Sequence, residues 1–232
     1  MERLLECNNL TKKYGAFTAL NNLTITLNRG RVIGLLGPNG SGKSTFLKLI
    51  NGLLVPNNGD IFVGGHPIGP ETRKIISYLP ERTYLPSSET VHSFLEYFKD
   101  FYEDFDQNKA MEMLKRLNID PKSKLKDLSK GTKEKVQLIL VMSREADLYC
   151  LDEPIGGVDP ASRDYILNTI MKSYHPSSSI LISTHLIGDI EDILDDVIFL
   201  QNGNLTLYAP AEQIREKEGK TIDMLFREVF RC

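Results

Sequence analysis

Apolar and polar residues alternate along several short stretches of this chain, and the period of the alternation changes with position. Residues 23–27, LTITL, alternate with a period of two, and residues 59–63 show a similar pattern. This period is typical of strands with one buried face, so we expect an antiparallel sheet within the first sixty residues. Residues 32–36, VIGLL, are all apolar or glycine and predict a buried strand.

The spacing becomes helical between residues 90 and 117. Phe94, Phe98, Phe101 and Phe105 recur every three or four residues, with charged residues between them. Such spacing places apolar side chains on one face of a helix. We therefore expect a helical insertion whose core contains the four rings.

Short apolar runs separated by helical stretches follow residue 146. They predict strands over 148–151, 180–183, 197–200 and 205–208, a helix over 160–171 capped by Asp159, and helix over the last twenty residues. The strand–helix–strand order favours parallel pairing of the first two strands. Asn202-Gly203-Asn204 separates the last two and predicts a hairpin turn.

Composition narrows the class of protein. The 232 residues are 41% hydrophobic, which suits one large α/β domain, and a net charge of −3 gives no sign of a broad basic surface for nucleic acid. Apolar runs such as 138–142 are far shorter than the roughly 18 residues that span a bilayer. Cys7, Cys150 and Cys232 are scattered, and the acidic N-terminus is unlike a secretory signal, so we expect a soluble chain in a reducing cytoplasm.

One loop carries the most specific chemistry. Residues 37–44, GPNGSGKS, match G-x-x-x-x-G-K-[ST] between a predicted strand and a predicted helix, which is the pattern of a triphosphate-binding loop. Lys43 is expected between the β- and γ-phosphates, and the Ser44 hydroxyl on the Mg²⁺ that bridges them. The residues expected to bind the nucleotide here are Gly37, Pro38, Asn39, Gly40, Ser41, Gly42, Lys43, Ser44 and Thr45.

Two adjacent carboxylates follow the predicted strand 148–151. In a parallel sheet the carboxyl ends of the strands line the ligand crevice, so Asp152 is placed to hold Mg²⁺ through its water shell. Glu153 would then lie beside the γ-phosphate, where a carboxylate orients and deprotonates water.

Two further motifs indicate the kind of phosphate-loop protein. LSKGT at 128–132 leads into a predicted helix over 133–143, and Ser183-Thr184-His185 ends a strand. With these motifs in order, the chain resembles the nucleotide-binding subunit of an ATP-binding cassette (ABC) transporter over nearly all of its length. The resemblance implies an α/β fold with a RecA-like P-loop NTPase core of parallel sheet, an N-terminal antiparallel β-subdomain and an inserted α-helical subdomain. It implies a single domain over 1–232, with a catalytic core at 1–83 and 146–232 and a helical signature subdomain at 84–145.

The resemblance also implies roles for individual residues. Tyr14 matches the aromatic residue that stacks on adenine, and Ser129 and Gly131 match signature residues that contact the γ-phosphate of a nucleotide held by a partner subunit. Glu153 matches the catalytic carboxylate and His185 the switch histidine. The implied assembly is a head-to-tail dimer that closes over two ATP molecules. A helix that begins at Ser129 would offer free amide donors to a phosphate.

Two positions depart from the family pattern. Lys130-Gly131-Thr132 stands where Gly-Gly-Gln is usual, and Lys130 either points to solvent or supplies an extra cation near the phosphate. Glu81 stands where glutamine is commoner, although a glutamate still accepts from a Mg²⁺-bound water. Both variations resemble those of bacterial exporters of the antibiotic-resistance and sodium-extrusion type.

The function expected from this resemblance is hydrolysis of ATP, with Mg²⁺, to drive export through a separate integral-membrane permease. The chain would be peripheral on the cytoplasmic face of the membrane, as a homodimer or a heterodimer with another ABC ATPase. The aromatic residues within 94–105 are expected to form the core of the helical subdomain. In the alternative, the exposed ones among them would bind a short coupling helix of the permease.

Two other functions are weighed against transport. An ABC ATPase that acts on ribosomes or DNA usually carries two cassettes or long coiled coils. A GTPase or small-molecule kinase would leave LSKGT unexplained, and the chain has neither N-K-x-D nor D-x-x-G. The sequence of an ATPase subunit is not expected to reveal the transported substance, because such a subunit need never contact it.

Overall fold

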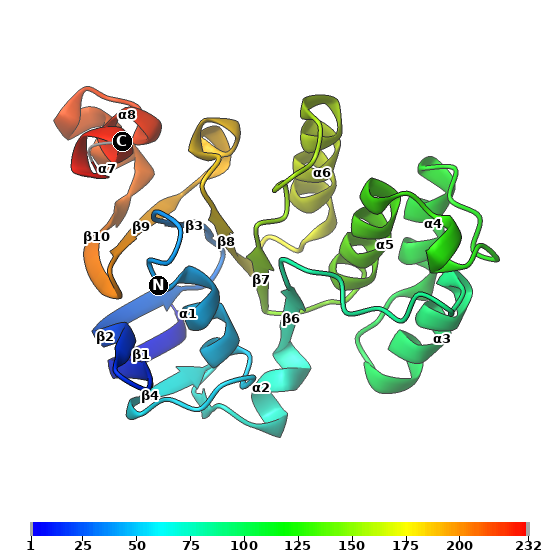
Figure 1. The fold of residues 1–232 in the computed structure, drawn as a ribbon, viewed down its shortest axis with the longest axis horizontal. Coiled ribbons are helices and arrows are strands. Elements are labelled where there is room, and N and C mark those ends of the chain that lie inside the picture. Colours follow the sequence, from blue (N-terminus) through cyan, green and yellow to red (C-terminus); the bar gives the residue numbers. More distant parts are fainter. Residues whose placement is uncertain (1, 231–232) are drawn as a thin grey trace.

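Two β-sheets form one end of the molecule and a group of helices forms the other (Figure 1). This computed structural model describes residues 2–230, apart from the side chains of residues 161 and 162. Cys232 lies outside the described residues, and Cys7 and Cys150 are buried free thiols. Among the described residues, no helix combines the length and the apolar character needed to cross a membrane.

The first sheet is antiparallel and has the order β2-β1-β4-β5. Its strands are β1 (Arg3–Tyr14), β2 (Phe17–Asn28), β4 (Asn58–Val63) and β5 (His66–Pro67). The expected antiparallel sheet is therefore present. Its central strand β1 was not predicted, because NNLTKKY at 8–14 shows no regular alternation.

The second sheet has the order β10-β9-β3-β8-β7-β6 and is parallel except for the β9–β10 pair. Its strands are β3 (Val32–Leu36), β6 (Ile76–Leu79), β7 (Leu148–Asp152), β8 (Ser179–Thr184), β9 (Asp196–Gln201) and β10 (Asn204–Pro210). β3, β7 and β8 are buried along their whole length, as their apolar runs predict. Asn202 and Gly203 both have positive φ, which confirms the predicted hairpin turn.

Several helices begin directly after a capping side chain. They are α1 (Lys43–Ile50), α2 (Pro70–Ile75), α3 (Val91–Phe101), α4 (Gln107–Arg116), α5 (Lys130–Met142), α6 (Pro160–Ser173), α7 (Ala211–Glu218) and α8 (Ile222–Phe230), with short 3₁₀ turns at Leu125–Asp127, Ile187–Asp189 and Glu191–Ile193. Thr90, Asp106 and Ser129 cap α3, α4 and α5 by accepting from the amide three residues on. The helix expected over 133–143 therefore begins earlier, directly after Ser129.

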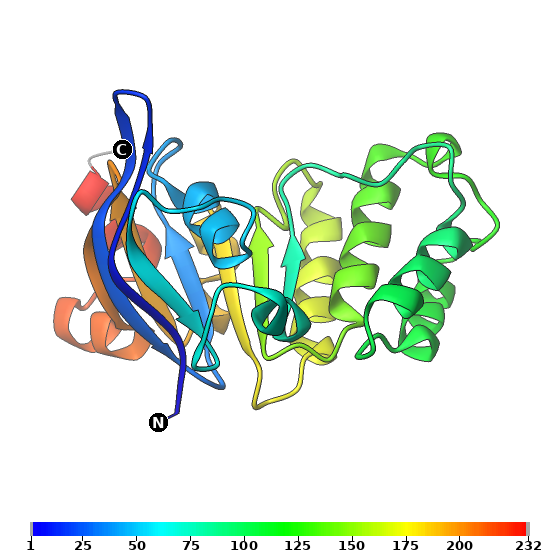
Figure 2. The same ribbon diagram turned by 90° about the horizontal axis from the view of Figure 1, so that it is seen from below.

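Helix α1 packs between the two sheets. Phe46, Leu47 and Ile50 are fully buried and join one apolar cluster with residues of both sheets, which fixes the loop before α1. Helices α3, α4 and α5 lie together at the opposite end from the antiparallel sheet (Figure 2). The boundaries 84–145 for a helical subdomain stay a prediction.

One part of the aromatic prediction was wrong. Phe94, Phe98 and Phe105 are buried, but 66% of Phe101 is exposed. The expected helical stretch is also two helices, because the chain leaves α3 after Phe101 and re-enters a helix only after Asp106. Phe101 therefore lies at the last turn of α3, where it points away from the core.

Candidate functional site

The phosphate loop joins β3 to α1 and is held in shape by close backbone contacts. Gly42 has a φ of 108°, and a Cβ there would lie 2.5 Å from the Ala19 carbonyl oxygen. A Cβ at Gly37 would lie 2.3 Å from the carbonyl oxygen of Leu200. Only glycine fits both positions, so the main chain of the loop stays free of side-chain bulk.

Lys43 is the first residue of α1 and is 6% exposed. Its Nζ donates to the carbonyl oxygens of Gly37, at 2.7 Å, and Pro38, at 3.3 Å. Burial lowers the pKa of this ammonium, while the nearby carboxylates of Glu153, Asp152 and Glu81 act to raise it. The loop therefore presents a partly desolvated cation, which favours an anionic ligand.

Asp152 ends β7 and is 2% exposed. Its Oδ1 accepts hydrogen bonds from the hydroxyls of Ser44, at 3.1 Å, and Ser183, at 2.5 Å. The parallel register pairs Asp152 with Ser183, so the ends of neighbouring strands bring these oxygens together. Ser183 was not among the predicted site residues, although its place at the end of the apolar run 180–182 was a usable signal.

Glu153 follows Asp152 in a left-handed conformation, with a φ of 51°. Such a conformation is uncommon for a residue other than glycine and occurs often at functional sites. The Glu153 amide donates to the Ser183 carbonyl at 3.0 Å, which holds the turn. The carboxylate Oε2 lies 3.1 Å from Nδ1 of His185, and the side chain of Glu153 is 13% exposed whereas that of His185 is 51% exposed.

A narrow crevice of about 30 Å³ connects the acidic residues. Glu81, Asp152 and Glu153 all line it, together with Gln137 of α5. The consecutive Asp152 and Glu153 and, from a second segment, Glu81 thus line one space. The Asp152 carboxylate and the Ser44 hydroxyl, 3.1 Å apart, are hard oxygen donors of the kind that suits Mg²⁺.

The remaining predicted site residues lie apart from this crevice. Tyr14 ends β1 and is 47% exposed, with the Lys12 Nζ 5.4 Å from its ring centroid. Ser129 is exposed, and the hydrogen bonds described for it run only to Thr132 and Lys133. A Cβ at Gly131 would meet nothing within 4 Å. The first turn of α5 is thus open to an external group.

The Lys130 side chain lies near Glu134 and Gly157. Its Nζ lies 3.8 Å from Glu134 and 3.7 Å from the place where a Cβ on Gly157 would be. Its side chain is 82% exposed. This geometry places the cation beside the loop that follows Glu153, on the surface of the chain.

A second, larger hollow lies between the sheets and the helical end. It is a groove of about 1100 Å³, with one wall from α1 and α2, the other from α3 and residues 102–104, and a floor from β6 and the end of α5. Leu53, Tyr84 and Phe101 line it and are each more than half exposed. Such a cluster of exposed apolar side chains marks an interaction surface.

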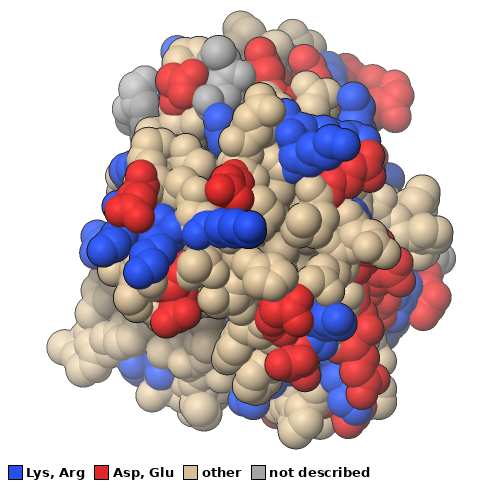
Figure 3. Space-filling view, turned by 90° about the vertical axis from the view of Figure 1, so that its right-hand side faces the viewer, with Lys and Arg blue, Asp and Glu red and all other residues tan. Residues whose placement is uncertain are grey.

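The outer face of the helical end has a different character. In Figure 3 Lys and Arg are interspersed with Asp and Glu over this face. A nucleic-acid-binding face would instead gather positive charge. The described residues of this face therefore do not gather positive charge in the way that a polyanion would require.

Comparison with known proteins decides the family. Residues 20–156, more than half of the chain, match the ABC transporter family. The chain belongs to this family. It is 30% identical to the linearmycin resistance ATP-binding protein LnrL of Bacillus subtilis (strain 168), over 87% of this chain and 68% of that protein. It is 29% identical to the SkfA peptide export ATP-binding protein SkfE of the same organism, over 97% of this chain and 98% of that protein.

A solved structure of similar shape agrees. The ATP-binding subunit of an ABC transporter superposes with a TM-score of 0.88, at 31% identity, over 98% of this chain and 99% of that one. The predicted α/β P-loop fold is confirmed. As an ATP-binding member of the ABC transporter family, the chain is an ATPase.

Proposed function

We propose that this chain hydrolyses ATP between two copies arranged head to tail and drives export through a separate integral-membrane permease. The observation that carries this proposal is the separation of the site into two parts. The phosphate loop and the acidic crevice form one part, while Ser129 is exposed on another element with only local hydrogen bonds. Since this one chain carries every part, two copies suffice to build two equivalent sites.

Each part has its own task in the proposed cycle. The loop amides and Lys43 bind the phosphates, and Tyr14 stacks on the adenine. Ser129 and Gly131 of the second copy close the site from across the interface, because the start of α5 presents free amides and a positive dipole end to the γ-phosphate. Closure excludes water other than the one that attacks.

Glu153 is the proposed general base. Its carboxylate accepts the proton of the attacking water, and the His185 ring, 3.1 Å away, holds that carboxylate in position. We propose that Ser44 and Asp152 hold Mg²⁺ and that Glu81 contacts its water shell. The ion would offset negative charge on the triphosphate.

The groove is the proposed seat of the permease. Its exposed Phe101, Tyr84 and Leu53 suit the apolar face of a short helix from a membrane-embedded partner. This contact would hold the chain at the cytoplasmic face of the membrane. Export is the proposed direction because the names of two relatives refer to linearmycin resistance and to SkfA peptide export.

Site-directed crosslinking tests this function in cells. With a crosslinker attached at Phe101→Cys, we expect a covalent adduct to a multi-span membrane protein. Met111→Cys on α4 is a matched control, because Met111 is 41% exposed but does not line the groove. An ATPase that acts on ribosomes or DNA would instead sediment with nucleic acid and lose that association as salt rises. That result would refute the transport proposal.

A further inference from the structure

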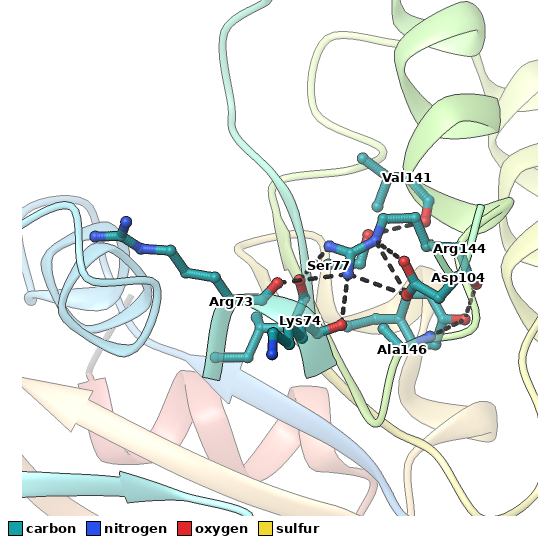
Figure 4. Close-up of polar contacts among 9 residues, drawn as sticks. Arg73, Lys74, Ser77, Asp104, Val141, Arg144 and Ala146 are labelled. Carbon is teal, nitrogen blue, oxygen red and sulfur yellow. Dashed lines mark hydrogen bonds and ion pairs between the residues drawn. The ribbon is translucent and has the colours of Figure 1, made fainter. Parts of the chain in front are cut away.

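Arg144 is a buried cation that follows α5 and contacts several separate segments (Figure 4). Its side chain is 3% exposed. Nε donates to the Asp104 carboxylate at 3.0 Å, Nη1 donates to the Ile76 carbonyl at 2.5 Å, and Nη2 donates to the Lys74 carbonyl at 2.7 Å. The guanidinium carbon also lies 3.9 Å from the centroid of the Tyr102 ring. Every nitrogen of the guanidinium group is thus in use.

These partners belong to opposite sides of the groove. Lys74 is in α2 on the sheet-side wall, and Ile76 begins β6 on the floor. Asp104 and Tyr102 are on the helical wall. Arg144 itself lies on the floor and bonds both walls. This one side chain therefore bridges the two walls directly.

The same residue is joined to two parts of the ATP site. Helix α5 runs from Lys130 to Met142, and its 13 residues measure about 20 Å, so it links Arg144 rigidly to Ser129. β6 runs from Ile76 towards Glu81. The Ser77 hydroxyl donates to the Val141 carbonyl at 2.9 Å, which holds β6 against α5. A movement of the walls would thus reach both Ser129 and Glu81.

We propose that Arg144 is a positioning residue that couples the groove to the ATP site. A segment seated in the groove presses on both walls, and the Arg144–Asp104 pair converts that pressure into a shift of α5 and β6. This inference rests on the proposed function, since it takes the groove as the seat of a permease segment. Arginine suits the task because its planar fork of donors reaches several acceptors at once, whereas lysine carries its donors on one atom.

If the Arg144–Asp104 pair only stabilises the fold, a different result is expected. Loss of a structural pair lowers stability and raises exchange near the break. Loss of a coupling pair also frees the distant end of α5, where Ser129 is. Residues 77–83 directly follow Ile76, a partner of Arg144, so faster exchange there is expected in either case. Hydrogen exchange measured by peptide distinguishes the two, because it reports local opening segment by segment.

The test uses the full chain with three single substitutions. Asp104→Asn removes the charge that pairs with Arg144 but keeps the shape of the side chain, and Arg144→Lys keeps the buried charge but cannot reach both walls. Glu112→Gln is the control, since it weakens an exposed ion pair on α4 in which Arg116 Nη2 lies 2.5 Å from Glu112 Oε1. Exchange is followed in peptides covering 77–83 and 128–133, with and without MgATP, and kcat and KM for ATP are measured.

We expect Asp104→Asn and Arg144→Lys to speed exchange about tenfold in both peptides, and the rise at 128–133 is the one that indicates coupling. We also expect kcat to fall while KM for ATP stays within about twofold, because the phosphate loop itself is untouched. Glu112→Gln should match the parent chain in all of these. Unchanged exchange at 128–133 in Asp104→Asn would overturn the proposal, whatever happens at 77–83, and this result holds even if Arg144→Lys fails to fold.

The two proposals fail in different ways. If the parent chain gives no crosslink from Phe101→Cys, the seat of the permease is wrong. If that crosslink forms but Asp104→Asn leaves exchange at 128–133 and kcat unchanged, the seat stands and the coupling role of Arg144 is wrong.

Discussion

Ser183→Ala is the substitution with the most specific expected cost. The Ser183 side chain is fully buried, and its hydroxyl donates to the Asp152 carboxylate at 2.5 Å. Alanine removes that donor and leaves Ser44, at 3.1 Å, as the other donor to the same oxygen. The backbone of Glu153 keeps its bond to the Ser183 carbonyl. The hydroxyl also accepts from the Glu153 amide at 3.2 Å, so alanine removes one hydrogen bond to the Asp152 carboxylate and one from a backbone amide.

The magnitude follows from the charge on the acceptor. A hydrogen bond to an ionised group contributes about 1.5–3 kcal/mol, against about 0.5–1.5 kcal/mol for a neutral pair. In a chain of this length each kcal/mol lowers the Tm by about 2–4 °C, so Ser183→Ala should lower it by about 3–12 °C. Ser179→Ala is a matched control in the same strand, because Ser179 is equally buried, donates to the neutral Asn28 carbonyl at 3.2 Å and also accepts from a backbone amide, that of Arg31, at 3.4 Å. The two variants therefore differ in the charge of the group to which the lost hydroxyl donates.

Urea denaturation of both variants without nucleotide measures the difference. We expect Ser183→Ala to lose more free energy of unfolding than Ser179→Ala, with an unchanged denaturant slope. An equal or smaller loss in Ser183→Ala would refute the reasoning. It would show that the Asp152 carboxylate does not depend on the Ser183 hydroxyl.

Three other substitutions test the proposed general base, the phosphate loop and a buried thiol. Glu153→Gln should lower ATP turnover by about 10²–10⁴-fold while an ATP-bound dimer accumulates on size exclusion, and unchanged phosphate release would remove Glu153 from its role. Lys43→Ala should weaken binding of a fluorescent ATP analogue at least about tenfold, and parental affinity would contradict the loop assignment. Burial raises the pKa of Cys150 from 9.0 to about 12, so the unfolded chain ionises first and stability falls as pH rises between these values. In urea titrations, Cys150→Ala should reduce the loss of unfolding free energy by up to about 1.4 kcal/mol per pH unit in this range. If the variant and the parent chain lose stability equally as pH rises, the thiol contributes nothing.

Local signals explain what the sequence could predict. The phosphate loop needs glycines within eight consecutive residues, and Asp152 and Glu153 directly follow an apolar strand, so chain position alone places them. The hairpin at Asn202-Gly203 is equally local. The fold class followed because motif order along the chain is sufficient for it.

The features that were missed depend on contacts between distant segments. Ser183 meets Asp152 only through the parallel register of β7 and β8, which no local pattern specifies. Arg144 and Asp104 are 40 residues apart and pair because α5 returns beside the α3–α4 connection. The exposure of Phe101 depends on where α3 ends, and an apolar period does not report whether another element covers the ring.

Mixing two inactive variants tests the central claim most directly. Lys43→Ala disables the phosphate loop, and Ser129→Arg blocks the exposed start of α5, so each variant alone should hydrolyse little ATP. In a head-to-tail pair of one copy of each, one of the two sites regains both an intact loop and an intact serine. We predict that an equimolar mixture recovers up to about a quarter of parental ATP turnover, since half of the pairs are mixed and each has one intact site. A mixture no more active than its separate components would contradict a site shared between two copies.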